Sequence, residues 1–134
     1  MKKNLLFLFL ACTTLAFAQD KLAYQLYDKN GKKVKYSKLL TSSTKSDVVL
    51  FGEYHNNSVV HWLQLELTKD LAEKKNLVLG AEMLEADNQN AVNKYLSDEI
   101  NQKGLDTLAR LWKNYKTDYK PLVDFAKEKK FEFI

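Results

Sequence analysis

The side chains best suited to chemistry in this 134-residue sequence stand directly after two apolar runs or shortly beyond the first of them. The first run covers residues 47–51 and the second covers residues 77–81. Polar side chains that follow neighbouring strands can share one crevice, since the carboxyl ends of parallel strands meet at one edge of the sheet. The candidate site residues are Glu53, His55, His61, Gln64 and Glu82.

Two carboxylates and two imidazoles at one edge suit three kinds of chemistry. An imidazole held by a carboxylate is a general base that can activate water or an alcohol. Neutral imidazoles and carboxylates also bind divalent metals, although the spacing of His55 and His61 matches no standard zinc motif. A polar crevice with His and Tyr can hold haem iron, whose axial ligands include both residue types. In a fourth interpretation, these side chains only satisfy one another within a structural or interaction domain.

A parallel sheet is the element that would bring these residues together. Continuous apolar runs such as 47–51 and 77–81 are typical of strands covered on both faces. A third strand is predicted at 131–134, and amphipathic spacing predicts helices between the strands. Asn57 or Ser58 can cap the first of these helices. The predicted helices cover residues 57–75, 87–96, 105–115 and 121–130.

These elements predict an α/β fold, with a parallel-sheet core, helices on both faces and an N-terminal hairpin. The hairpin is expected over residues 22–36, because Asn30-Gly31 suits the positive φ of a tight turn. A chain that ends on a strand leaves a sheet edge exposed. We therefore expect the fold to be incomplete at the C-terminus and the sequence to be the N-terminal part of a longer protein.

Composition excludes several classes of protein. Lys and Arg number 21 against 17 Asp and Glu, and without Lys2 and Lys3, which lie in a predicted signal peptide, the balance is 19 − 17 = +2. That charge is too weak to indicate nucleic-acid binding. A single Cys excludes both a disulfide framework and a zinc site with several Cys ligands.

The N-terminus has the pattern of an export signal. A short basic region is followed by the apolar run 5–15, and then by Ala16-Phe17-Ala18 at the expected cleavage position. We expect residues 1–18 to be removed and residues 19–134 to form one domain that is periplasmic or at the cell surface. Lipid attachment at Cys12 is the alternative, but the apolar stretch before it is short, so cleavage after Ala18 is preferred.

At this point the sequence resembles the ChaN-like haem-binding proteins, over roughly residues 22–134. The resemblance lies in Val-Leu-Phe-Gly-Glu-Tyr-His at 49–55 and Leu-Gly-Ala-Glu-Met at 79–83. ChaN-like proteins belong to a superfamily that also contains erythromycin esterases and the TIKI/TraB group. Trp112, Tyr119 and Phe125-Ala126 also fall where the family pattern has similar residues. The motif positions that carry over are Gly52, Glu53, His55, His61, Gln64, Glu82, Met83 and Gln89.

The resemblance implies an exported, often lipid-anchored protein of haem or iron uptake. Its implied partners are haem, a second copy of the chain in a homodimer, and an outer-membrane haem or iron uptake receptor. Family members can carry a Tyr on the iron, but no single position here matches that Tyr. A characteristic Asn-x-Pro-Arg segment is also absent, which agrees with the expected truncation. The implied haem-binding residues are Glu53, His55, His61, Gln64, Glu82 and Tyr119.

A hydrolase is the rival interpretation. Superfamily esterases use a Glu/His pair that is similar to Glu53 and His55, and Glu82 would be a second acid or an orienting group. Metal-dependent TIKI-type peptidases are a variant of this hypothesis. Trp62 and Trp112 are interpreted as packing residues of the core or the rim.

Overall fold

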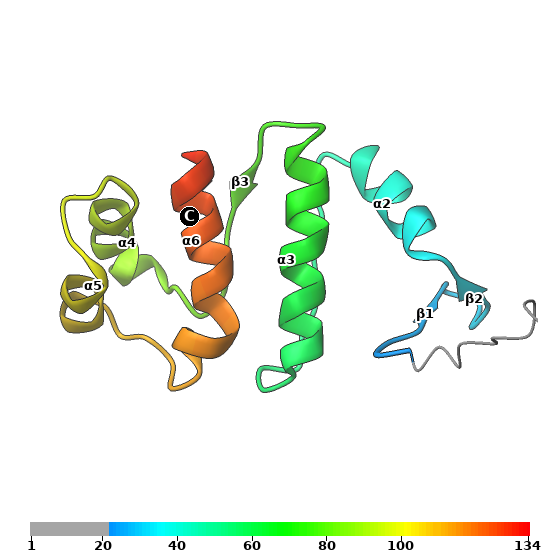
Figure 1. Cartoon of the computed structure of the whole chain (residues 1–134), viewed down its shortest axis with the longest axis horizontal. Coiled ribbons are helices and arrows are strands. Elements are labelled where there is room, and N and C mark those ends of the chain that lie inside the picture. Colours follow the sequence, from blue (N-terminus) through cyan, green and yellow to red (C-terminus); the bar gives the residue numbers. More distant parts are fainter. Residues whose placement is uncertain (1–21) are drawn as a thin grey trace, which may run out of the picture.

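The structure is a computed structural model, and it describes residues 22–134 (Figure 1). The predicted signal peptide and Cys12 lie outside the described residues. Within residues 22–134, helices and short strands alternate, so the α/β class is confirmed in this coarse form. No helix among these residues is long and apolar enough to cross a membrane.

The N-terminal hairpin is confirmed, although its strands are short. Strand β1 (Leu26–Tyr27) pairs antiparallel with β2 (Lys33–Val34). In the turn, Gly31 has φ 75°, a conformation that costs glycine little. Helix α2 (Tyr36–Thr44) follows the hairpin directly.

Helix α3 (Ser58–Ala72) carries two of the candidate residues. It begins where Asn57 caps it, because the Asn57 side chain accepts hydrogen bonds from the backbone N–H groups of Val59 and Val60. One stripe of the helix is buried and includes Leu63, Leu67 and Leu71 at helical spacing. His61 lies on the same stripe, and its side chain is therefore directed into the protein.

Only two parallel strands form the second sheet. Strand β3 (Val78–Leu79) pairs with β4 (Glu132–Phe133), with Leu79 opposite Phe133. The Ile134 N–H extends the ladder by donating to the Leu79 carbonyl at 2.8 Å. The predicted strands at 77–81 and 131–134 are thus present, but shorter than expected.

The predicted strand at 47–51 is wrong, because this segment has no strand conformation. The side chains of Val48 and Leu50 are 74% and 92% exposed. A strand is held by hydrogen bonds to a neighbour, and each described sheet consists of one pair only, β1-β2 or β3-β4. The parallel-sheet core therefore has two strands where three were expected.

Helices fill the rest of the chain between β3 and β4. After the 3₁₀ turn Ala86–Asn88 come α4 (Gln89–Leu96) and α5 (Gln102–Leu108). A π-helical turn, η3 (Tyr115–Tyr119), leads directly into α6 (Lys120–Lys129), which has Pro121 in its first turn. The helix predicted at 105–115 is therefore wrong in its bounds, because the chain leaves helical conformation at Ala109 and regains it at Tyr115.

The hydrophobic core lies between these helices and β4. Its most buried large side chains come from η3, α6, β4, the turn after β3 and the helices α4 and α5. Helix α6 contacts α3, α4 and η3, so it connects the core with the helix that carries His61. The largest fully buried side chains are Tyr115, Phe133, Met83, Leu105, Val92 and Val123.

Candidate functional site

The Glu53 carboxylate is the centre of a polar network. Gln64 donates to Glu53 Oε2 from its amide nitrogen at 2.6 Å, and the Tyr119 hydroxyl donates to Glu53 Oε1. His61 Nδ1 lies 3.5 Å from Glu53 Oε2. The loop after segment 47–51, helix α3 and the π-helical turn η3 therefore meet at one side chain. An ionised carboxylate accepts several hydrogen bonds, which suits this position.

Both ring nitrogens of His61 face an oxygen atom. The NH₂ group of the Gln64 amide donates a hydrogen bond to the Glu53 carboxylate. The oxygen of the same amide therefore faces His61 Nδ1, at 3.1 Å. His61 Nε2 faces the carbonyl oxygen of His55, also at 3.1 Å. His61 is only 4% exposed, and its ring is enclosed by Glu53, Gln64 and the His55 carbonyl.

The peptide carbonyl of His55 is held from two sides. His61 Nε2 donates to it from α3, and the side chain of Asn114 donates to it from the segment before η3. Asn114 is itself oriented by a 2.8 Å hydrogen bond to Asp118. Two donors on one carbonyl fix the backbone of an otherwise exposed loop.

The imidazole of His55 is exposed and packs against an aromatic side chain. Its ring centroid lies 4.6 Å from that of Trp112 at an interplanar angle of 56°. Trp112 in turn lies edge-on to Tyr119, and Tyr119 lies edge-on to His61 at 4.6 Å between centroids. The aromatic series joins the exposed imidazole to the buried one. Trp112 is half-buried at the rim of the core.

Burial and the neighbouring carboxylates raise the pKa of the Tyr119 phenol. Desolvation is the largest cause, followed by the hydrogen bond to Glu53, and the charges of Glu53, Asp118 and Glu82 act in the same direction. All of these disfavour the phenolate. The Tyr119 hydroxyl is thus held neutral and donates to Glu53.

The other candidate residues are placed differently. Glu82 lies in an exposed turn after β3, and its only described influence on the network is its charge. Met83, the next residue, is buried in the core. Gln89, at the start of α4, donates to the carbonyl of Phe133 and so supports β4 and not the network. The structure therefore brings together Glu53, His61, Gln64, Tyr119 and the backbone of His55.

The Glu53/His55 pair that the hydrolase hypothesis names is not hydrogen-bonded. Among the described residues, the imidazole beside Glu53 is that of His61, and the two oxygens of Glu53 already accept from Tyr119 and Gln64. In the same part of the chain, no group of three or more His, Cys, Asp and Glu side chains is arranged to hold a metal ion.

Asn114 is the member of the site that sequence reasoning missed. Asn114 stands between Lys113 and Tyr115, and nothing in this local pattern marks it as a site residue. Only the fold shows that its side chain reaches the carbonyl of His55, 59 positions earlier.

A protein-family model matches this chain. The family is described as "Haem-binding uptake, Tiki superfamily, ChaN", and its model matches residues 39–134. The matched range contains every candidate residue and Asn114. The chain belongs to this haem-binding family. Searches of curated proteins and of solved structures give no match.

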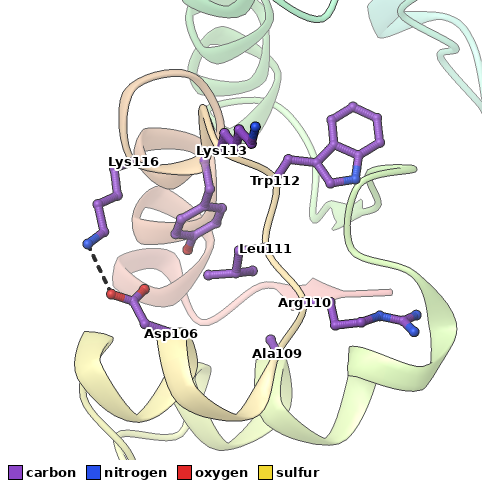
Figure 2. A pocket seen from close by; sticks show the side chains of 8 residues that line it. Asp106, Ala109, Arg110, Leu111, Trp112, Lys113 and Lys116 are labelled. Carbon is purple, nitrogen blue, oxygen red and sulfur yellow. Dashed lines mark ion pairs between the residues drawn. The ribbon is translucent and has the colours of Figure 1, made fainter.

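A pocket borders the site of this ChaN-family chain (Figure 2). It has a volume of about 410 Å³ and lies along residues 106–116. Lys116 pairs with Asp106 at 3.1 Å on one side, and in Figure 2 Arg110 and Trp112 extend to the other side of the chain. The same Trp112 contacts His55, so the pocket and the exposed imidazole share one wall.

Proposed function

We propose that this chain is an exported haem-binding protein of haem or iron uptake, and that haem lies against His55 and Trp112. The observation that carries the proposal is the family match over 39–134, a range that contains the whole site. Haem is the cargo in this proposal. Its binding would place iron near a side chain that can ligate it and a porphyrin near an apolar aromatic surface.

The chemistry of the donors supports His55 as the residue that faces haem. Both nitrogens of His61 are engaged, and the Tyr119 hydroxyl is engaged by Glu53. His55 is exposed, and a neutral imidazole is a common haem ligand. The Trp112 indole beside it offers an aromatic surface to the porphyrin, and the exposed Lys113 offers a cation to the propionates.

Export, location and partners belong to the same proposal. The sequence pattern of residues 1–18 supports passage across a membrane, after which the domain would act in the periplasm or at the cell surface. We also propose a homodimer and an outer-membrane haem or iron uptake receptor as partners, because the resemblance to the family implies both.

A haemin titration followed by Soret absorbance tests the proposal on the purified chain. We expect saturable binding and, for His55→Ala, an affinity at least tenfold lower, because the exposed ligand is removed. Tyr27→Ala is the matched control, since Tyr27 is an exposed aromatic residue of the remote hairpin. A folded wild-type chain without a saturable Soret change would overturn the proposed function.

A further inference from the structure

The His55 loop has an unusual support for an exposed segment. Its side chain lies at the surface, but its backbone carbonyl accepts from two side chains that come from distant parts of the chain. His61 approaches from α3, six positions later, and Asn114 approaches from the residue that precedes η3. Such an arrangement restricts the backbone, and with it the direction of the side chain.

The network behind His61 strengthens this support. The His61 ring is in turn held by Glu53 at 3.5 Å and by the Gln64 amide, which Glu53 orients. Glu53 is fixed from the opposite side by Tyr119. The buried part of the network therefore acts on the surface through a single atom, the carbonyl oxygen of His55.

We propose that His61 and Asn114 are positioning residues, which hold the His55 carbonyl and thereby fix the His55 imidazole against Trp112 to receive the ligand. The inference rests on the proposed function for the identity of the ligand, which is haem. It assigns His61 a role different from the direct haem contact that the sequence implied. The 4.6 Å contact between the rings of His55 and Trp112 is the geometry that the two donors maintain.

Paired substitutions separate positioning from simple structural support. His61→Gln keeps an N–H donor at about the reach of Nε2, whereas His61→Asn places its amide nitrogen nearer Nδ1 and leaves the His55 carbonyl without it. Asn114→Ala removes the second donor. Because Asn114 is only half-buried, we expect this variant to fold even if the His61 variants do not. Asn93→Ala, on the far helix α4, is the control for loss of an exposed Asn.

Two measurements on the purified full chain decide the matter. In the haem-free state, the backbone ¹⁵N order parameter of residue 55 should be about 0.85 in the wild type and below about 0.6 in Asn114→Ala and His61→Asn. In haemin titrations, these two variants should bind at least fivefold more weakly and alter the Soret band as His55→Ala does. Asn93→Ala should keep wild-type order, affinity and spectrum, and His61→Gln should lie closer to the wild type than His61→Asn does in all three.

The results distinguish failure of this inference from failure of the proposed function. If Asn114→Ala and His61→Asn remain ordered at residue 55, or bind haemin with the wild-type spectrum and an affinity within twofold, positioning is contradicted. If the wild type binds no haemin, the proposed function falls. The order parameter in the haem-free chain then still decides whether the two donors fix His55.

Discussion

At the scale of single residues, the network around Glu53 is fully paired. Each oxygen of Glu53 has a donor, and each nitrogen of His61 has an acceptor. Taking one partner out of a buried polar network leaves the others without a hydrogen bond, which costs about 1–3 kcal/mol for each. The members of the site therefore cannot be exchanged independently.

Tyr119→Phe should destabilise the chain by about 1–2 kcal/mol at neutral pH, because it removes a hydrogen bond to a carboxylate. The raised pKa of Tyr119 gives this effect a pH dependence. The stabilisation is fully present below the ordinary tyrosine pKa of 10.0 and is lost as pH rises towards the higher folded value. Urea unfolding at several pH values measures it, and above pH 10 the wild type should lose stability faster than the variant.

Tyr54→Phe is the control for this substitution, since the Tyr54 side chain is 78% exposed. Its effect should stay within about 0.5 kcal/mol. Equal stability of wild type and Tyr119→Phe at neutral pH would show that the Tyr119–Glu53 hydrogen bond contributes nothing net.

At the scale of elements, the site is assembled at ends and connections. The His55 loop precedes the capped start of α3, Asn114 directly precedes the π-helical turn, and Tyr119 is the last residue of that turn. π-Helical turns are rare and often occur at functional sites. Close packing also governs the helix that precedes this turn, where a Cβ added to Gly104 would lie 2.8 Å from Ile100 Cβ.

Gly104→Ala should destabilise the chain by about 1–3 kcal/mol, even though Ala normally stabilises a helix interior. The new methyl group would meet Ile100 Cβ, which cannot move without the backbone. Gly52→Ala is the matched control, because open space surrounds its added Cβ, and it should be neutral or stabilising by up to about 1 kcal/mol. Urea unfolding compares the two, and a stabilised Gly104→Ala variant would contradict the packing.

At the scale of the whole molecule, the chain combines a well-packed helical core with exposed apolar side chains around the short parallel sheet. Val78 and Ile134 are exposed beside β3 and β4, and Val48 and Leu50 are exposed on the unpaired segment. Exposed apolar surface of this kind is available to a partner. This surface is compatible with a homodimer, which stays a prediction.

The prediction at this scale concerns the export of the chain and the cleavage of its N-terminal segment. A chain expressed with its N-terminus intact should be recovered outside the cytoplasm as 116 residues (134 − 18) that begin at Gln19. Intact-mass measurement and N-terminal sequencing check this. Cys12→Ala should leave the product unchanged, and Ala18→Glu should block cleavage. A lipid-modified N-terminus at Cys12 would contradict cleavage after Ala18.

Local patterns determined which residues matter and much of the secondary structure. The Asn-Gly turn, the Asn57 cap, the spacing in α3 and Pro121 in α6 each act over a few residues, and each is present as predicted. The family also follows from short motifs, and the family match confirms it. The sequence thus placed Glu53, His61, Gln64 and Tyr119 in one candidate site.

Tertiary structure decided what each of these residues does. The run at 47–51 has the composition of a strand, but strand formation needs a partner that the sequence pattern does not specify, and the segment is unpaired. Likewise, spacing brought both histidines near Glu53 but could not tell which one would be buried. Packing of α3 against η3 enclosed His61 and left the His55 imidazole exposed on Trp112, because a side chain's access to ligand depends on neighbours that are far away in sequence.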